Sequence, residues 1–467
     1  MIKEEAHQVI DIYNNIYQVT GELSRGGQGV VYRTMVPNVL VKEDFEGDAE
    51  TNQHYMDLHL LPLPKRLHIT LPKVPLGGGK TGYIMELLED MKSFQEAFAD
   101  HDESDLHDIQ SEMVQGFLSS DEDETRRFGI RFGSLILNGG FRRILRGYLG
   151  AAKVLNILHS GGLVYCDFSP NNAFISSDLT KFNVWLIDAD NVDFAGNIKN
   201  AFMTPDYGAP EVQSGKSHST FWSDIFAFSS CLFQQLLHIH PFEGEQFEEC
   251  LDNEEEIEDV ESKRNYGVFP YILDEDDASN YNKMAAEMCD WIPDNLWGLF
   301  QQTFGQGRLK KAARPLMSEW VVGLAYALDG MVQCQSCKMD YSAADRGGIC
   351  PYCDEHTPII RVTSTFPKGN ELWRFISESK EDWPIHVPLR IAHGLLMDDE
   401  GDPTAFTIRI DKAKNMQIDK VSDDVSIVLP NGNKVFHYKC TDTPAVTFKL
   451  VDERRGIISN ILIECED

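Results

Sequence analysis

The stretch VYCDFSPNNAF, residues 164–174, and the stretch VWLIDADNV, residues 184–192, together decide the fold of this chain. The first places Asp167 and Asn172 five residues apart, and the second places Asp188 after a hydrophobic strand. An Asx-rich turn would account for Asp167 and Asn172 alone, because both side chains often cap their own backbone. It does not predict a third acid after a hydrophobic strand, so we interpret the three residues as one polar site.

A glycine-rich loop and a lysine precede these residues. In the loop LSRGGQGVVY, residues 23–32, Gly26, Gly27 and Gly29 let backbone amides approach phosphate oxygens closely. The segment VLVK then places Lys42 on the next strand, where it would point toward phosphates; a solvated lysine is the alternative. A phosphate cradle, an ammonium group, metal ligands and a carboxylate that orients a hydroxyl are the parts that phosphoryl transfer needs.

The order of these motifs resembles that of eukaryotic-type (Hanks-like) serine/threonine protein kinases, from about residue 17 to residue 328. The domain order and the variant motifs YCDFSPNN and DADN also look similar to those of prokaryotic or phage stand-alone kinases. The family's loop G-x-G-x-x-G-x-V corresponds to Ser24, Gly26, Gly29 and Val31, with serine in place of the first glycine. Its H-R-D-x-x-x-x-N and D-F-G motifs correspond to Tyr165, Cys166, Asp167 and Asn172 and to Asp188, Ala189 and Asp190.

The resemblance implies a role for each matched residue. Asp167 would orient the substrate hydroxyl and accept its proton, while Asn172 and Asp188 would ligate Mg²⁺. Lys42 would contact the ATP phosphates and pair with a helix glutamate, for which Glu50 is the best candidate and Glu46 the second. The residues expected at the nucleotide or its metal are Ser24, Gly26, Gly27, Gly29, Val31, Lys42, Glu50, Met85, Glu86, Leu88, Asn172 and Asp188.

Three departures from the family pattern affect the mechanism. Cys166 replaces an arginine that reads a phosphate on the activation segment, so we expect activity without that phosphorylation. Ser169 stands where these kinases commonly carry a lysine that touches the γ-phosphate. Asp190 replaces a glycine and adds either a charge near the metal or a backbone cap. With Ser24, these changes leave open a pseudokinase scaffold that binds nucleotide or protein partners without phosphotransfer.

Later motifs favour a protein acceptor. The segment TPDYGAPE, residues 204–211, matches the part of the family that shapes the acceptor peptide site. Asp224 resembles the helix aspartate that anchors the catalytic loop, and Arg314 resembles the arginine that pairs with the glutamate of A-P-E, here Glu211. Small-molecule kinases share the early motifs but typically lack the later ones, so the resemblance implies a serine/threonine protein kinase.

Four cysteines have the spacing of metal ligands. Cys334 and Cys337 form one C-x₂-C pair, and Cys350 and Cys353 form a second pair twelve residues later. Each pair places two thiolates on one tight turn, and two such turns close a tetrahedral S₄ site. We therefore predict structural Zn²⁺ in a module that resembles a zinc ribbon and is too small to fold around its own core. The alternative is a reduced, metal-free loop.

Composition divides the chain into a kinase-like part and two smaller modules. We expect an α+β fold, in which a bilobal kinase-like domain is followed by a zinc ribbon and a β-rich, sandwich-like domain. Apolar periodicity predicts helices at 140–160 and 222–240, and Asn431-Gly432 predicts a hairpin. The boundaries are 1–330 for the kinase-like domain (N-lobe about 16–90, solvated acidic insertion about 98–125, C-lobe about 126–330), 331–356 for the ribbon and 357–467 for the β-rich domain.

The charge balance limits the partners. The 467 residues include 42 basic and 74 acidic side chains, a net charge of −32, which disfavours nucleic acid and anionic membranes. We expect a protein substrate. The negative charge would favour a basic one, and the alternative is that the charge serves solubility alone. Family analogy adds a phosphatase or adaptor partner in signalling or stress response. No apolar run reaches the roughly 18 residues that span a bilayer. The polar N-terminus and the cysteine spacing predict a cytoplasmic protein.

Overall fold

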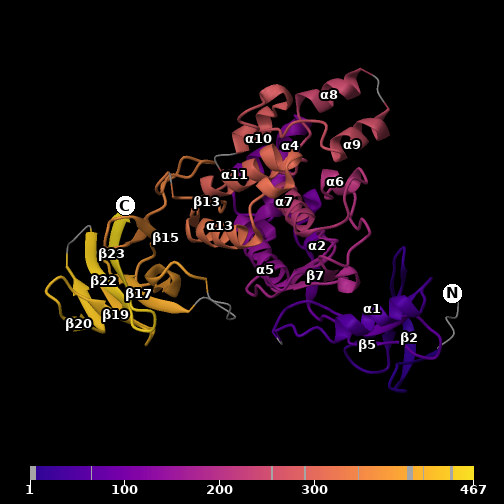
Figure 1. The fold of residues 1–467 in the computed structure, drawn as a ribbon. Coiled ribbons are helices and arrows are strands. Elements are labelled where there is room, and N and C mark those ends of the chain that lie inside the picture. Colours follow the sequence, from indigo (N-terminus) through magenta and orange to yellow (C-terminus); the bar gives the residue numbers. More distant parts are fainter. Residues whose placement is uncertain are drawn as a thin grey trace.

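The computed structural model describes residues 7–64, 66–253, 256–288, 291–344, 346–396, 403–413, 415–441 and 445–466. Along the chain, a small sheet with one helix is followed by a helical region and then by a region of β-sheets (Figure 1). This mixture of helices and sheets agrees with the predicted α+β class. Among the described residues, no helix combines the length and the apolar character that crossing a bilayer would require.

The N-terminal sheet carries the glycine loop and Lys42. Its strand order is β1-β2-β3-β4-β6-β5, and the glycine loop is the turn between β2 and β3. Helix α1 (Ala49–His59) follows β4 and is capped by the Asp48 side chain, which accepts from the Thr51 amide. The strands are β1 (Gln8–Ile10), β2 (Ile16–Arg25), β3 (Gly29–Thr34), β4 (Val39–Asp44), β5 (Val74–Pro75) and β6 (Gly82–Glu86).

The register of this sheet decides which side chains share a face. Val31 of β3 lies opposite Lys42 of β4, and Lys42 lies opposite Tyr83 of β6. Directly opposed residues of antiparallel strands project to the same face, so these three side chains form a row. Tyr83 packs edge-on against Tyr55 of α1, with ring centroids 4.9 Å apart. Helix α1 therefore covers the face of the sheet that carries Lys42.

Two long helices form the centre of the helical region (Figure 1). They are α5 (Gly140–Ser160) and α7 (Phe221–Leu237), close to the two helices that periodicity predicts. Phe228 of α7 meets Trp320 of α13 edge-on, at a centroid separation of 5.7 Å. The region's other longer helices are α3 (Glu112–Leu118), α4 (Asp123–Leu137), α8 (Glu245–Asp252), α9 (Ile257–Asn265), α10 (Lys283–Met288), α11 (Asp294–Phe300) and α13 (Met317–Asp329). Its short strands are β7 (Met91–Ser93), β8 (Leu163–Val164), β9 (Ala173–Ser176), β10 (Val184–Leu186) and β11 (Asp193–Phe194).

The described acidic side chains of the segment at 98–125 are exposed, but the segment also docks on the core, which a fully solvated insertion would not do. It contains α3 and the start of α4, and Leu106 and Val114 are fully buried in the main apolar core. Ser111 caps α3 by accepting from the Val114 amide. The few apolar side chains between the acids are enough to dock the segment, because burial of each large one contributes about 1.5–3 kcal/mol.

The cysteine module packs against the helical region and has no separate apolar core among the described residues. Its strands are β12 (Met331–Gln333) and β13 (Asp340–Ser342). Val332 and Tyr341, both fully buried, belong to the same apolar core as the helical region. The module therefore gains stability from packing as well as from any metal it holds.

A buried carboxylate of this module holds the start of α5. Asp340 is 1% exposed and accepts hydrogen bonds from the Arg142 amide at 3.0 Å and from the Arg142 Nε at 2.9 Å. Gly140 has a φ of 78°, and a Cβ there would lie 2.1 Å from an Asp340 carboxylate oxygen, so this position requires glycine. A carboxylate at a helix N-terminus is also favoured by the helix dipole. The module thus braces the helix that leads toward Asp167.

The described residues between 359 and 466 form two antiparallel sheets around one apolar core. The sheet orders are β15-β14-β23-β22-β19-β20 and β16-β17-β18-β21, and the Phe406 and Phe448 rings meet between them at 5.5 Å. Asn431-Gly432 lies in the turn between β19 and β20, as predicted. The strands are β14 (Ile359–Thr365), β15 (Glu371–Glu378), β16 (Ile385–Pro388), β17 (Thr404–Ile410), β18 (Met416–Lys420), β19 (Val425–Val428), β20 (Lys434–Val435), β21 (His437–Cys440), β22 (Ala445–Asp452) and β23 (Ile457–Glu466).

The predicted pair of Glu211 with Arg314 is confirmed. The guanidinium donates to both Glu211 carboxylate oxygens at 2.8 Å and to the Trp222 carbonyl oxygen at 2.8 Å. The Arg314 side chain is fully buried, and that of Glu211 is 18% exposed. Burial alone would raise the pKa of Glu211, but the bonds and charge of Arg314 outweigh burial and lower it.

We predict that Arg314→Ala lowers the free energy of unfolding by about 3–5 kcal/mol, because it leaves the Glu211 carboxylate buried without its partner. Urea denaturation of the full chain measures this difference. Lys283→Ala is the control, since Lys283 and its partner Glu287 are 83% and 68% exposed; its cost should stay within about 0.5 kcal/mol.

The contribution of the Glu211–Arg314 pair to the free energy of unfolding should depend on pH. A carboxyl group whose pKa is lower in the folded chain stabilises the fold above its unfolded pKa, about 4.3 for glutamate. That stabilisation is lost as pH falls through the folded pKa, when Glu211 takes up a proton. The difference in the free energy of unfolding between wild type and Arg314→Ala should therefore become smaller in acid. A difference that stays constant below about pH 4 would contradict this account.

Candidate active site

One carboxylate of α7 holds the backbone of the catalytic loop just before Asp167. Asp224, 1% exposed, accepts from the Tyr165 amide at 2.7 Å and from the Cys166 amide at 2.9 Å. These bonds confirm the predicted anchoring role of Asp224. They fix Cys166 at a φ of 81°, a left-handed conformation that is unusual for a residue with a side chain. Burial raises the pKa of the Cys166 thiol, so this cysteine stays protonated.

Asp167 and Asn172 are tied to each other and to the activation segment. The Asn172 amide donates to the Asp167 carbonyl oxygen at 2.9 Å, and the Thr204 hydroxyl donates to Asp167 Oδ1 at 2.7 Å. Burial of the Asp167 carboxylate raises its pKa, and the bond from Thr204 partly offsets that effect. Asp167 is therefore a half-buried carboxylate whose orientation is set by a neighbouring hydroxyl.

Asp188 lies beside this pair. The Ile187 amide donates to the Asn172 carbonyl oxygen at 2.9 Å, and the Tyr165 hydroxyl donates to the Ile187 carbonyl oxygen. Asp188 itself has a φ of 53°, in the left-handed region that aspartate tolerates better than most residues. The end of β10 thus places the Asp188 carboxylate next to the catalytic loop.

Lys42 reaches these residues from the sheet. Its Nζ donates to Asp188 Oδ1 at 2.9 Å and also pairs with Asp190 Oδ2. Burial of the ammonium would lower the pKa of Lys42, but the charges of Asp190 and Asp188 outweigh burial and raise it. Burial and the nearby Asp188 raise the pKa of Asp190 to about 6, although Lys42 opposes this shift. The structure therefore brings Lys42, Asp167, Asn172 and Asp188 together.

The predicted pairing of Lys42 with Glu50 is wrong in this structure. Among the described residues, the carboxylates that pair with Lys42 are Asp188 and Asp190, whereas Glu50 and the second candidate, Glu46, are exposed. The physical reason is the position of Glu50 in the first turn of α1, on the solvent side. The sequence pattern allowed Asp190 a charge near the metal, but it gave no sign that this carboxylate would take the place of Glu50 beside Lys42.

The other residues predicted at the nucleotide lie on or near the N-terminal sheet. Gly29 needs to be glycine, since a Cβ there would lie 2.4 Å from the Glu43 carbonyl oxygen. At Gly26 and Gly27, no heavy atom of the described chain lies within 4 Å of a Cβ position, so the loop is open to a ligand. Ser24 pairs with Val31 across the loop hairpin. Met85 and Glu86 end β6, Glu86 pairs with Lys73 at the surface, and Leu88 follows half-buried.

A large cavity opens between the glycine loop, α1 and the segment after Asp188. Its volume is about 930 Å³, and Gly27, His54 and Phe202 contribute to its walls. Six carboxylates line it, and Lys199 is the one lysine or arginine among the described lining residues. The carboxylates are those of Asp44, Glu46, Asp48, Glu50, Asp190 and Asp193. The cavity is therefore strongly acidic.

The chemistry of Asp188, Asn172 and Lys42, together with the glycine loop, fits a nucleoside triphosphate and a divalent cation. The Asp188 side chain, 41% exposed, and the Asn172 amide offer the oxygen ligands that hard cations prefer. The glycine loop leaves the backbone around Gly27 uncovered, and Lys42 presents an ammonium group that is held in place by two carboxylates. Backbone amides and ammonium groups both suit phosphate oxygens.

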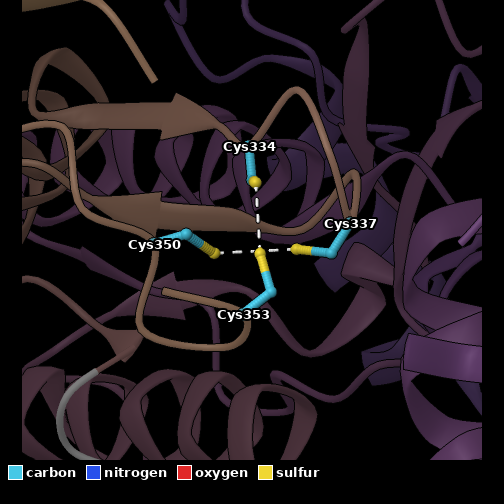
Figure 2. A group of neighbouring side chains, drawn as sticks. All are labelled: Cys334, Cys337, Cys350 and Cys353. Carbon is cyan, nitrogen blue, oxygen red and sulfur yellow. Dashed lines mark hydrogen bonds between the residues drawn. The ribbon is translucent and has the colours of Figure 1, made fainter. Parts of the chain in front are cut away.

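The four cysteines of the module converge on one point (Figure 2). Their sulfur atoms all lie within 4.8 Å of one another, and Cys334 to Cys353 and Cys337 to Cys350 are each 3.6 Å apart. Four sulfurs bound tetrahedrally to zinc at about 2.3 Å would lie about 3.8 Å apart. The cluster therefore has the donor set and the dimensions of a closed structural zinc site, as a zinc ribbon requires.

Comparison with known protein families agrees with the central part of this site. Residues 143–301, about a third of the chain, match the family model of the protein kinase domain. The matched span includes Asp167, Asn172 and Asp188, whereas Lys42 and the glycine loop precede it. The chain thus contains a protein kinase domain, which implies phosphotransfer with ATP and a divalent metal, and a protein substrate. None of the curated proteins matches the chain.

We predict one zinc ion per chain in the purified protein, measured by elemental analysis. The double variant Cys334→Ser, Cys337→Ser should lose the metal, because half of the thiolate ligands are removed, and its thermal midpoint should fall because the module shares the main core. Cys250→Ser, at a half-buried cysteine of α8, is the control and should keep the metal. Full zinc content in the double variant would rule out this site.

Proposed function

We propose that the chain is an ATP- and Mg²⁺-dependent serine/threonine protein kinase that transfers the γ-phosphate to a protein hydroxyl. The observation that carries this proposal is the set of contacts linking Lys42, Asp188, Asn172 and Asp167. In this proposal the N-terminal sheet and the helical region are the two lobes of a kinase domain, and the β-rich region after the zinc ribbon is a separate domain.

The roles of the side chains follow from their positions. Bound Mg-ATP supplies the phosphoryl group. Lys42 holds the phosphates by charge, and Asn172 and Asp188 hold the divalent cation. Asp167 orients the acceptor hydroxyl and takes its proton, and its raised pKa makes it a better base than an exposed aspartate. Asp224 keeps the loop in the geometry that these steps need.

The acceptor is proposed to be a serine or threonine in a basic protein segment. The Thr204 hydroxyl, in the segment TPDYGAPE, donates a hydrogen bond to Asp167, which supports a role for this segment in shaping the acceptor site. The acidic cavity next to the glycine loop favours lysine and arginine side chains through charge complementarity. We further propose a cytoplasmic protein with a role in signalling or stress response, in which a phosphatase or adaptor is a partner.

We predict that the full-length protein transfers radiolabelled γ-phosphate from Mg-ATP to a basic serine peptide, and to an acidic serine peptide much more slowly. Asp167→Asn should lower the rate by about 100-fold or more, because it removes the base. Asp178→Asn, at an exposed aspartate that caps Thr180, should transfer at the wild-type rate. Phosphoamino acid analysis of the product should give phosphoserine and, with a threonine peptide, phosphothreonine.

The competing candidate is a pseudokinase scaffold, favoured by the buried Ser169 where a lysine is expected. Nucleotide binding without any transfer to either peptide, or transfer that survives Asp167→Asn, would contradict the proposed activity. Transfer to tyrosine alone would leave a protein kinase but exclude the serine/threonine class.

We also predict that Thr204 acts through its hydroxyl and not as a phosphorylation site. Thr204→Ala should lower the rate by roughly 10- to 100-fold, since it removes a hydrogen bond to a charged group worth about 1.5–3 kcal/mol. Thr204→Ser keeps the hydroxyl and should retain most of the rate. Intact-mass analysis should show wild-type protein that is active without a phosphate on the segment; activity that tracks phosphate at Thr204 would contradict this prediction.

A further inference from the structure

We propose that Asp190, and not a carboxylate of helix α1, is the residue that positions Lys42 for the phosphates. The inference rests on the proposed function, because Asp190 would act by positioning Lys42 for phosphotransfer. Its geometry stands on the described contacts alone.

Helix α1 covers Lys42 without offering it a carboxylate. The Tyr55 hydroxyl donates to Asp44 Oδ2 at 2.8 Å, and the His54 Nε2 donates to the Asp190 carbonyl oxygen at 2.7 Å. These two residues occupy the part of the helix nearest the site. Glu50 lies one turn earlier and is exposed. The helix therefore contacts the backbone of the segment that pairs with Lys42, and not Lys42 itself.

The two carboxylates that pair with Lys42 differ in their access to solvent. The Asp188 side chain is 41% exposed, whereas that of Asp190 is 4% exposed. A buried carboxylate needs a partner to compensate for its lost hydration. Oδ1 of Asp190 has no hydrogen-bond partner among the described residues, so the contact of Oδ2 with Lys42 provides most of that compensation. Asp188 is accessible to a cation, while Asp190 stays paired with Lys42.

The chain geometry explains how two residues of one turn reach the same ammonium group. Asp188 and Asp190 flank Ala189, which is fully buried, at the start of a short 3₁₀ turn, η2 (Ala189–Asn191). The left-handed conformation of Asp188 turns the chain so that both carboxylates face Lys42. The counter-ion of Lys42 therefore belongs to the same segment as Asp188. A displacement of α1 would not remove it.

The first test measures how fast acetic anhydride modifies Lys42 in the nucleotide-free, full-length protein, followed by mass spectrometry. Asp190→Asn should speed the reaction, because the Lys42 ammonium group then loses the buried one of its two ion-pair partners. Asp190→Glu keeps the charge and should stay close to wild type. Asp193→Asn is the matched control, since its carboxylate bonds to the Phe194 amide and to Asn197 and should not affect Lys42.

Modification of Lys42 that is unchanged in Asp190→Asn, whether or not it rises in Glu50→Gln, would overturn the inference. A rise confined to Glu50→Gln would assign the counter-ion to α1. Should Asp190→Asn fail to fold by circular dichroism, carbodiimide cross-linking of the wild-type protein decides, because a Lys42–Asp190 cross-link supports the inference and a Lys42–Glu50 cross-link contradicts it.

A kinetic measurement distinguishes failure of this inference from failure of the proposed function. With Mg-ATP, Asp190→Asn should lower kcat/KM for ATP by about 10- to 100-fold through misplacement of Lys42. If no protein, wild type included, transfers phosphate while Lys42 still responds to Asp190→Asn, the proposed activity fails and the positioning role stands. If phosphate transfer is found but Lys42 does not respond, the positioning role fails alone.

Discussion

The buried ammonium group of Lys42 is the charge around which the site is arranged. A lysine that is 6% exposed needs carboxylate partners, because burial without them would cost several kcal/mol. Those partners, Asp188 and Asp190, come from the helical region, whereas Lys42 comes from the N-terminal sheet. One ion-pair cluster thus joins the two parts of the chain and places the lysine beside the catalytic loop.

The rest of the site is held by buried polar contacts that originate far away in the sequence. Asp224 of α7 fixes the backbone before Asp167, and Asp340 of the cysteine module fixes the start of α5. The module shares its apolar core with the helical region. The module that carries the four clustered cysteines is remote from the chemistry, but it therefore supports the helix that leads into the catalytic loop.

Much of the fold could be predicted because local signals agreed with the final packing. Helix α5 lies between two glycine pairs and has apolar residues at helical spacing, and the Asn431-Gly432 turn needs only local conformations. The partner of Lys42 could not be predicted, since pairing with Asp190 depends on the turn at Asp188 and on the orientation of α1. The burial of residues 98–125 was missed because composition averages over Leu106 and Val114, which dock while the surrounding acids stay exposed.

The most direct test of the central claim is a calorimetric titration of the full-length protein with ATP, with and without Mg²⁺, compared with Lys42→Met and Asp188→Asn. The account predicts one ATP per chain, tighter binding with Mg²⁺, weaker binding in Lys42→Met and loss of the Mg²⁺ effect in Asp188→Asn. Binding that is absent, or that is indifferent to Mg²⁺ and to both substitutions, would show that these side chains do not form a common nucleotide site.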